Sequence, residues 1–371
     1  MVTPMKGKDQ WSWTHNVGGG DFFRVFDKSG KRLAHQSMKT ITHRQGPCLT
    51  EVEFAGRIGE GIKHSVTTSL GRTDDLVRGC YRLRMEVTKE VEFSRFVIFQ
   101  VGADTYNFTR EGRFVFGDES GRILEKEVEF GKEGYRVDGV EIEGRTPWVS
   151  LEEGRPGNPK NDGGAWANRG IIVREWKARV GGESVGFRFA EHGVVRGKSE
   201  YSTIDLVLPS EITRLRPGDL IEAVVEYVVM PQKMDDYYGP NEYFKGGLAA
   251  YGGTWKMIHR EALGNQRLVR AATGKLERTF PDVRVSCEND EAKISLRGGL
   301  GYVPLTFAGL SRHDGYELKV NGEVLDQTVH GNDFWQTDYD AETRTWSRTY
   351  NLPRDGRRKA KIAFGRNFSG R

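Results

Sequence analysis

Short runs in which apolar and polar residues alternate follow one another along most of the chain. Alternation with a period of two places one side of a strand on a core and the other side in water, which is typical of antiparallel sheets. The clearest runs are at residues 22–26, 49–55, 62–70, 80–87, 93–101, 113–116, 171–176, 185–189 and 202–208. Helical periodicity is scarce, with residues 211–215 and 257–263 as the best short candidates. The pattern predicts an all-β protein with little helix.

A change in composition at residues 231–256 separates two groups of predicted strands. This stretch is rich in Tyr, Asp, Pro and Gly and shows no alternation, so we predict a long loop. Beyond it, about seven short strands suffice for one small β-sandwich. Between two of them, Asn321-Gly322 predicts a hairpin turn, because both turn positions favour positive φ. We therefore predict a large antiparallel sandwich at residues 1–264 and a smaller C-terminal β-sandwich at 265–371.

Composition is typical of a soluble globular protein. Hydrophobic residues make up 37% and charged residues 29%, with a mean hydropathy of −0.60. No apolar run approaches the roughly 18–20 residues of a membrane helix. Residues 1–11 lack the apolar segment of a signal peptide. The expected secreted or periplasmic location thus requires a leader outside this sequence, and a cytoplasmic location is the alternative.

Three widely spaced cysteines, Cys48, Cys80 and Cys287, form neither a disulfide framework nor a zinc pattern. Free thiols are expected, with one bridge between Cys48 and Cys80 as the alternative. The net charge is +4, and the basic residues are 36 Arg and 20 Lys. The charges are interleaved along the chain rather than gathered in runs, which gives little support for nucleic-acid binding.

Arginine presents a rigid fork that binds carboxylate or sulfate through two parallel hydrogen bonds. Biased codon usage is the alternative reason for its excess over lysine. Arginines at predicted strand positions are Arg82, Arg84, Arg95 and Arg174. If the chain acts on an acidic polymer, such side chains can neutralise its carboxylates.

Residues 48–110 resemble the antiparallel supersandwich of galactose-mutarotase-like domains, which occur in polysaccharide lyases and some glycoside hydrolases. The resemblance is one of pattern over about 250 residues, and it is carried by residues 46–58, 72–75, 95–107 and 218–231. No motif is specific enough to transfer a catalytic residue. The resemblance implies a supersandwich and an activity on carbohydrate, with a C-terminal sandwich similar to the accessory β-domains of such enzymes.

Residues 158–170 form the first candidate site. Asp162 and Asn168 offer oxygen atoms to sugar hydroxyls, Trp166 offers a flat face for a pyranose ring, and Arg169 offers a fork for a carboxylate. The alternative is a Gly- and Asn-rich loop that Trp166 anchors to the core. No cofactor is expected. A calcium ion is conceivable here, although the spacing matches no calcium loop.

Residues 235–243 form the second candidate site and the strongest one. Hydrolysis of a glycosidic bond needs two carboxylates, which Asp236 and Glu242 provide. Elimination from a uronate needs a base, often Tyr or His, for which Tyr237 and Tyr238 qualify, with Tyr243 as a substrate contact. The alternative is a solvated loop whose tyrosines cover a sheet edge.

Weaker candidates lie elsewhere. His15, near three consecutive glycines at 18–20, is a possible substrate contact in a segment that can equally be a flexible entry to the first strand. His64 lies within a strand, where a histidine is more often structural. Tyr106 follows a strand end, and Trp335 is either a core residue or a platform for a sugar. Candidate catalytic residues are thus Asp236, Tyr237, Tyr238, Glu242, Arg169, His64 and Tyr106.

These observations leave three functions open. The favoured one is a carbohydrate-active enzyme that cleaves an acidic, uronate-containing polysaccharide by β-elimination or hydrolysis. The second is a non-catalytic carbohydrate-binding or scaffolding fragment of a larger enzyme. The third is a structural β-protein. The expected partner is a polysaccharide or oligosaccharide, without nucleic acid or membrane.

Overall fold

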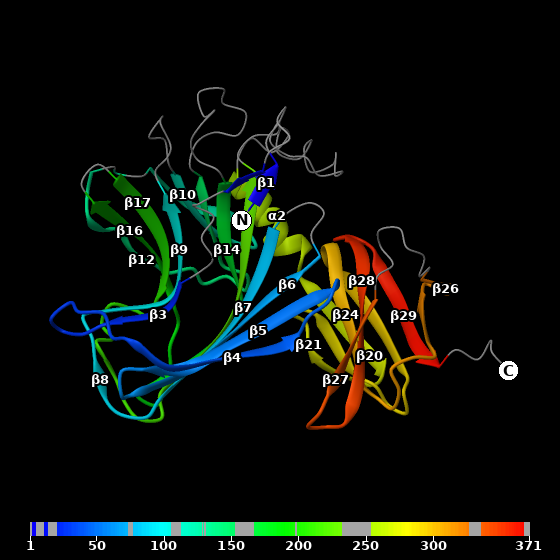
Figure 1. Ribbon diagram of the computed structural model, residues 1–371. Coiled ribbons are helices and arrows are strands. Elements are labelled where there is room, and N and C mark those ends of the chain that lie inside the picture. The colour runs from blue at the N-terminus through cyan, green and yellow to red at the C-terminus, as the bar shows by residue number, and fades with distance from the viewer. Residues whose placement is uncertain are drawn as a thin grey trace. The chain divides into compact units, whose positions relative to one another are not determined.

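The computed structural model consists almost entirely of strands, which confirms the predicted all-β class (Figure 1). It describes residues 2–4, 11–13, 21–72, 77–104, 113–127, 129, 131–152, 167–196, 199–231, 254–325 and 335–366. The chain divides into two compact units. The first holds residues 1–40, 53–67 and 75–262, and the second holds 41–52, 68–74 and 263–371. The contiguous boundary near residue 264 stays a prediction.

A large antiparallel sheet has the strand order β11-β10-β13-β14-β19-β7-β6-β5-β4, with β15 paired to β14. Its strands are β4 (His35–Arg44), β5 (Leu49–Ile58), β6 (Ile62–Gly71), β7 (Val77–Val87), β10 (Arg113–Asp118), β11 (Gly121–Glu127), β13 (Trp148–Glu152), β14 (Ala167–Val180), β15 (Glu183–Ser184) and β19 (Leu220–Pro231).

A five-stranded sheet of the first unit has the order β12-β16-β17-β9-β3. Its strands are β3 (Asp21–Phe26), β9 (Arg95–Asp104), β12 (Gly134–Val140), β16 (Arg188–Arg196) and β17 (Ser199–Val207). Two short pairs complete the described strands of this unit: β1 (Val2–Pro4) with β2 (Trp11–Trp13), and β8 (Val91–Glu92) with β18 (Arg214–Leu215).

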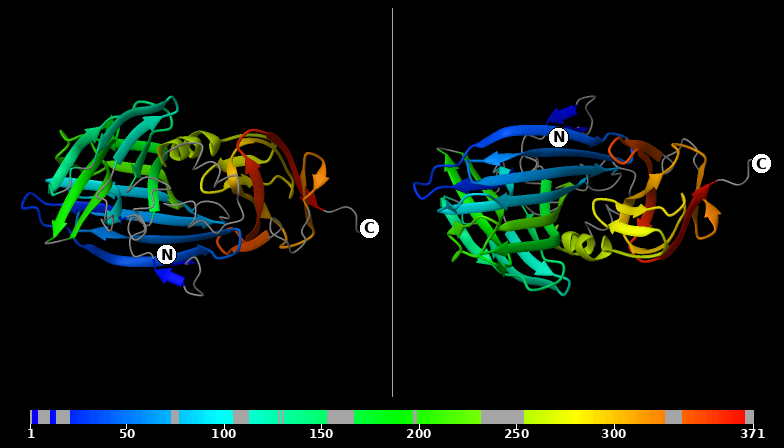
Figure 2. Two further views of the ribbon diagram at one scale, coloured as in Figure 1. Left: turned by 90° about the horizontal axis from the view of Figure 1, so that it is seen from above. Right: turned by 90° about the horizontal axis from the view of Figure 1, so that it is seen from below.

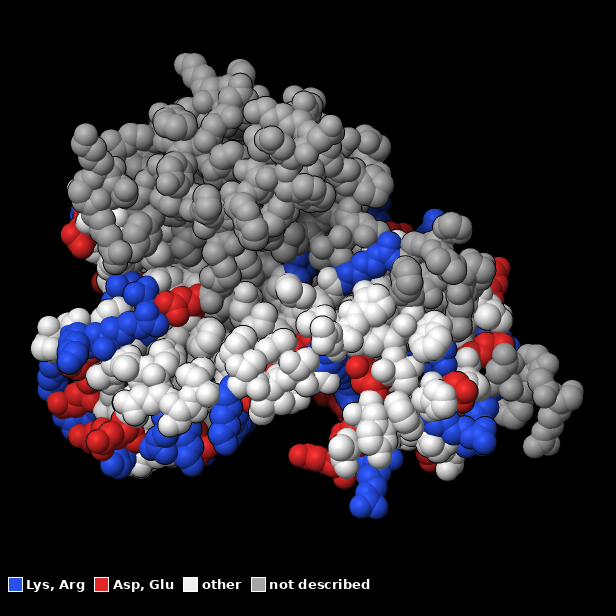
Figure 3. Space-filling model, viewed as in Figure 1, with Lys and Arg blue, Asp and Glu red and all other residues white. Residues whose placement is uncertain are grey.

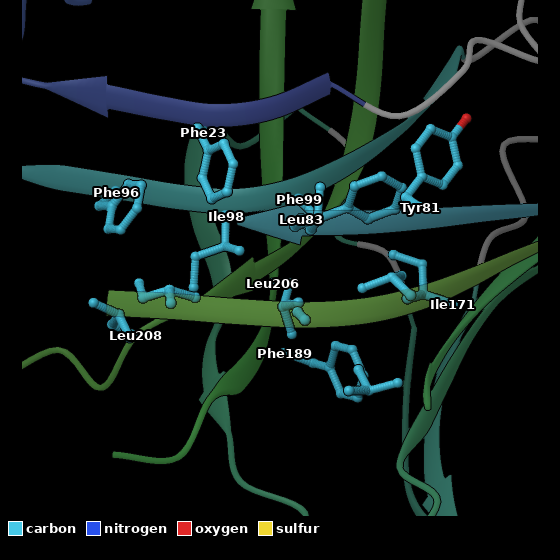
Figure 4. Close-up of a cluster of buried hydrophobic side chains, with 14 of the residues drawn as sticks. Phe23, Tyr81, Leu83, Phe96, Ile98, Phe99, Ile171, Phe189, Leu206 and Leu208 are labelled. Carbon is cyan, nitrogen blue, oxygen red and sulfur yellow. The ribbon is translucent and has the colours of Figure 1, made fainter. Parts of the chain in front are cut away.

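The core of the first unit lies between the large sheet and the five-stranded sheet. Phe99 and Leu206 enter it from the five-stranded sheet, and Leu83 and Ile171 from the large one (Figure 4). All four are nearly or fully buried. Because alternate residues of a strand face opposite ways, the period-two pattern of the sequence is what fills this core.

Helix α2 (Thr254–Gly264) covers the outer side of β14 and β19, with Met257 and Ile258 packed on Ile172 and Val228. The packing is close, since a Cβ atom at Gly170 would lie 2.4 Å from Cδ1 of Ile258. The two strands are therefore apolar on both faces here, one toward the other sheet and one toward the helix.

Arg174 of β14 holds the end of α2. Its guanidinium donates to the carbonyl oxygen of Ala262 at 2.7 Å and to that of Glu261 at 3.0 Å. Carbonyl groups in the last turn of a helix lack partners within the helix, and the last turn of α2 has no basic residue of its own. Arg174 also donates from Nε to Glu226 at 2.7 Å, and both side chains are only 3% exposed. The charge of Arg174 is thus paired within the fold and is not available to bind a substrate.

The second unit is a sandwich of two five-stranded sheets (Figure 2). One has the order β20-β23-β29-β25-β26 and the other β21-β22-β24-β28-β27. The strands are β20 (Arg267–Thr273), β21 (Lys275–Arg278), β22 (Val283–Ser286), β23 (Ala292–Gly298), β24 (Leu300–Leu310), β25 (Tyr316–Val320), β26 (Glu323–Val324), β27 (Trp335–Asp340), β28 (Thr345–Asp355) and β29 (Lys359–Arg366). Its core includes Phe307 and Phe364, whose rings stack at 4.1 Å.

A buried network of charges also lies within the second unit. Arg44 binds Glu51 and Asp282, each at 3.1 Å, and Arg278 binds the same two carboxylates at 3.1 and 2.6 Å. Burial alone would raise the pKa of Asp282, but the two arginines hold it at about 2. Arg44 and Glu51 thus join the segment 41–52 to Asp282 and Arg278 of the same unit by ion pairs.

Four local predictions are settled by the structure. Asn321 and Gly322 adopt φ of 55° and 94° between β25 and β26, as a hairpin turn requires. The helix predicted at 257–263 lies within α2, whereas the one predicted at 211–215 is wrong. Residues 214–215 form β18, because Arg214 and Leu215 pair with β8. All three cysteines are free, so the alternative Cys48–Cys80 bridge does not exist.

Replacing Arg174 tests the importance of the helix anchor. Arg174→Met removes an ion-pair partner of the buried Glu226 and the donor to the α2 carbonyls, so we expect a loss of about 3–5 kcal/mol in the free energy of unfolding. Arg84→Met is the matched control, because Arg84 pairs with Glu222 at a site where the side chains are 52% and 31% exposed. There we expect a loss of about 0–1 kcal/mol. Urea unfolding of the full chain measures both, and equal losses would contradict this assignment.

Candidate functional site

Most residues predicted to bind or cleave a substrate lie outside the described residues. These are His15, Tyr106, Asp162, Trp166, Asp236, Tyr237, Tyr238, Glu242 and Tyr243. Asn168 is described only through its backbone, which lies opposite Met230, and Arg169 lies opposite Val229 with its side chain fully buried. Ala167 lies opposite Pro231. The segments 153–166 and 232–253 are therefore attached to neighbouring strand ends.

His64 is the predicted catalytic residue whose surroundings are clearest. It lies on β6, 5% exposed, with Nε2 3.1 Å from Nδ1 of His35 and its ring against Phe22 and Phe23. Burial, together with the neighbouring His35, lowers the pKa of His64 to about 4, and burial also lowers the pKa of His35. The two imidazoles are thus neutral at pH 7 and share one hydrogen bond within an aromatic pocket.

A cluster on the five-stranded sheet surrounds Arg95. Its Nε donates to the hydroxyl of Tyr135 at 3.0 Å, its Nη1 donates to Nε2 of His192 at 3.1 Å, and its Nη2 binds Asp205. Asp205 is fully buried and also accepts from Gln100 at 2.6 Å. Each nitrogen of Arg95 already donates to a neighbour, which leaves this arginine poorly placed to grip a carboxylate from outside.

The same cluster contains a tyrosine and a histidine that resemble an acid–base pair. Burial and the charge of Asp205 raise the pKa of Tyr135, while burial and the charge of Arg95 lower the pKa of His192 to about 4. At neutral pH Tyr135 therefore keeps its proton and donates it to Asp205 at 3.2 Å. The arrangement suits a structural polar network better than proton transfer.

A groove of about 490 Å³ opens on the outer side of the first unit's large sheet. Its charged lining residues are Glu53, Arg82, Arg84, Glu175, Lys177 and Glu222. Two of these cations, Arg84 and Lys177, bind Glu222, the latter at 2.9 Å. Cations and carboxylates are balanced here. Figure 3 likewise shows basic and acidic side chains mixed over the part of the first unit near β3, β4 and β8.

A second groove, of about 410 Å³, has a different charge. It lies on the outer face of the sheet β20-β23-β29-β25-β26, and its lining includes five cations and no carboxylate. We call these cations the lysine face: Arg270, Lys293, Lys319, Lys359 and Lys361. Lys319 binds Glu317 at 2.7 Å. The other four make no ion pair with any described residue, and all five side chains are exposed.

Strand geometry brings the lysine face together. Lys293 and Lys319 both lie opposite Ala363, and Lys361 and Arg270 both lie opposite Ser295. Lys359 lies two residues before Lys361 on β29, so it shares that face. This group is hard to recognise along the sequence because its charges are interleaved with apolar residues. The signal was present, since basic residues that alternate with apolar ones within a strand gather on one face.

Neither metal ligands nor a membrane helix were found in the part of the chain that the structure describes. No three His, Cys, Asp or Glu side chains of the described residues are placed to hold an ion. The calcium alternative at 158–170 falls largely outside those residues. No described helix is long and apolar enough to cross a membrane.

Comparison with known proteins gives a likeness of fold. The sequence matches no protein-family model. It also matches no curated protein. A GH36 alpha-galactosidase, AgaA from Geobacillus stearothermophilus, is similar with a TM-score of 0.38 and 9% identity, over 74% of this chain and 36% of that one. The galactosidase domain of alpha-galactosidase-sucrose kinase AgaSK gives 0.35 and 10%, over 58% and 30%.

A heparan sulfate lyase, HepC from Pedobacter heparinus, gives a TM-score of 0.28 and 6% identity, over 80% of this chain and 33% of that one. The chain thus spans about a third of the length of these solved chains. By their names, these solved chains are glycoside hydrolases and a lyase. The likeness is limited to the fold, and no residue role is transferred from it.

Stability should fall in acid because of the histidine pair. A histidine whose pKa is lower in the folded state than its unfolded value of about 6.5 favours the folded state only while neutral. We therefore expect the unfolding free energy to be highest above pH 6.5 and to fall by roughly 2 kcal/mol between pH 6.5 and 4 through His64. Urea unfolding against pH measures this. His64→Gln should flatten the slope and His313→Gln, at a 64% exposed side chain, should not. An unchanged slope in His64→Gln would refute the assignment.

Proposed function

We propose that this chain is a carbohydrate-active protein that binds an acidic polysaccharide on the lysine face of its second unit. The single observation that carries the proposal is a groove with five cations and no carboxylate in its lining. The supporting contrast is the groove of the first unit, where cations and carboxylates balance.

The physical basis is electrostatic. A groove of one sign attracts a polymer of the opposite sign, and each anionic group that it neutralises releases bound counterions. Lys293, Lys359 and Lys361 have flexible stems and compact charges, so they can follow carboxylates or sulfates that repeat along a polymer. Binding should therefore tolerate variation in sequence and weaken steeply with salt.

A sugar polymer suits the groove better than a single-stranded nucleic acid. Proteins that bind single strands combine cations with aromatic side chains on which the bases stack. None of the residues lining this groove is aromatic. Its floor includes Ala271, Ser295 and Ala363, whose small side chains leave room for pyranose rings and hydroxyl groups between the cations.

We further propose that cleavage, by β-elimination or by hydrolysis, takes place at residues 235–243. The support is the pairing of Ala167 with Pro231, which attaches the two predicted site segments to adjacent strand ends. A polymer held by several cations is tethered to the same molecule as residues 235–243, which raises its effective concentration at those residues.

The lysine face is tested by removing three of its charges. We expect the triple variant Lys293→Gln, Lys359→Gln, Lys361→Gln to bind polygalacturonate about tenfold or more weakly at moderate salt, with a shallower slope of log affinity against log salt. The matched control is Lys31→Gln, Lys63→Gln, Lys126→Gln, which removes the same charge from exposed positions of the first unit. Calorimetric titration at several salt concentrations measures both. Equal weakening in the two triples, or tighter binding of duplex DNA than of the polysaccharide, would rule the proposal out.

The cleavage step is tested by conservative changes together with product analysis. If elimination is the reaction, Tyr237→Phe or Tyr238→Phe should lower kcat on polygalacturonate about 100-fold or more, and the product should carry a double bond. If hydrolysis is the reaction, Asp236→Asn and Glu242→Gln should have that effect with a saturated product. The lysine-face triple variant serves as a control in which KM rises and kcat holds. Full activity in all four conservative variants would exclude residues 235–243 as the catalytic site.

A further inference from the structure

Two exposed aromatic side chains lie on the last strand of the other sheet of the second unit. Strand β27 is the edge strand of β21-β22-β24-β28-β27. Trp335 and Tyr339 are 40% and 52% exposed, although large aromatic side chains usually bury most of their surface. They occupy alternate positions with Thr337 and so share one side of the strand, about 13 Å apart at the rise of an extended chain.

The neighbouring strand β28 places a cation beside them. Arg348 lies opposite Thr337, between Trp346 and Tyr350, which lie opposite Tyr339 and Trp335. The guanidinium carbon of Arg348 is 3.9 Å from the ring centre of Trp335 and 5.6 Å from that of Tyr350. The Trp346 ring lies 4.8 Å from Tyr339. Arg348 thus lies against the ring of Trp335, on the same face of the sheet as the ring pair Tyr339 and Trp346.

Arg348 is buried, and none of the described residues offers it an anion. It is 4% exposed, yet no described residue accepts a hydrogen bond from its guanidinium or pairs with its charge. Nε of Arg348 and the hydroxyl oxygen of Thr337, which lies opposite, are both buried, and neither has a hydrogen-bond partner among the described residues. Elsewhere in this unit the buried arginines Arg44 and Arg278 each bind two carboxylates. A buried cation that only aromatic rings stabilise is incompletely compensated, so an anion from outside would be favoured.

We propose that Trp335, Tyr339 and Arg348 form a second carbohydrate subsite, the aromatic edge, which takes a short acidic oligosaccharide. The exposed rings would receive the apolar faces of sugar rings, and Arg348 would pair with a carboxylate or sulfate of one unit. The separation of Trp335 and Tyr339 suits a chain of several rings. The choice of a sugar as the ligand rests on the proposed function, whereas the need for an anion rests on Arg348 alone.

This site differs in chemistry from the lysine face. The lysine face offers exposed point charges to a long polymer, and the aromatic edge offers shape and one enclosed charge to a few units. A short ligand should therefore depend on Trp335 and Arg348 and little on Lys293, Lys359 or Lys361. Because of that difference, the proposal for the lysine face can be wrong while the proposal for the aromatic edge holds, and the reverse is also possible.

The experiment titrates the full chain with trigalacturonate and with its methyl ester, whose carboxylates are masked, and follows tryptophan fluorescence and heat. We expect the acid to bind at least tenfold more tightly than the ester. Trp335→Ala and Arg348→Lys should each weaken the acid about tenfold or more, since lysine keeps the charge and loses the planar fork. Val324→Ala, a 52% exposed apolar position on another edge strand of this unit, should change nothing. Arg348→Met should bind acid and ester alike, and circular dichroism checks that it folds.

The outcomes separate the two proposals. Loss of trigalacturonate binding in Trp335→Ala and Arg348→Lys, with binding retained in the lysine-face triple variant, supports the aromatic edge. Unchanged affinity in both edge variants, equal affinity for acid and ester, no binding of trigalacturonate by the unaltered chain, or tighter binding of a nucleotide would overturn it. Loss of polygalacturonate binding in the lysine-face triple variant bears only on the first proposal.

Discussion

The pairing of β14 with β19 is the contact on which the first unit depends. Both faces of this ladder are buried, because Ile171 faces the five-stranded sheet while Ile172 faces helix α2. Arg174 then joins the ladder to the helix by binding Glu226 on β19 and the last carbonyls of α2. The ladder ends at Ala167 and Pro231, so it also fixes where the two predicted site segments leave the sheet.

Much of the fold follows from alternation in the sequence. A strand with one side in water needs apolar residues at every second position, and the run 80–87 shows that pattern and lies within β7, where Leu83 and Met85 are buried and Arg84 and Glu86 are exposed. The turn at Asn321-Gly322 follows from local conformational preference alone. These signals are local, which is why they can be read from one sequence without knowing what the strands pack against.

The remainder depends on contacts between residues far apart in the sequence. The segment 211–215 has some helical character by itself, but pairing of Arg214 and Leu215 with β8 overrides it. Arg95 resembles a free substrate-binding arginine until Tyr135, His192 and Asp205 are brought around it. Among the predicted site residues, His64 illustrates the same limit, since its low pKa comes from burial beside His35, which lies 29 positions away.

The second unit holds its charges in two ways, as buried ion pairs in the interior and as exposed cations on the surface. In its interior, Arg44 and Arg278 meet Glu51 and Asp282, so that burial of the charges is compensated within the fold. On its surface, four of the five cations of the lysine face make no ion pair with a described residue, and water solvates them there, so that their cost is small. Arg348 belongs to neither group, because it is buried as the interior arginines are, yet no described residue pairs with its charge. The lysine face thus offers a long-range attraction that salt screens, and the aromatic edge offers a short-range contact that salt screens little. The first would raise the rate at which a long polymer is encountered, and the second would select a short acidic oligosaccharide.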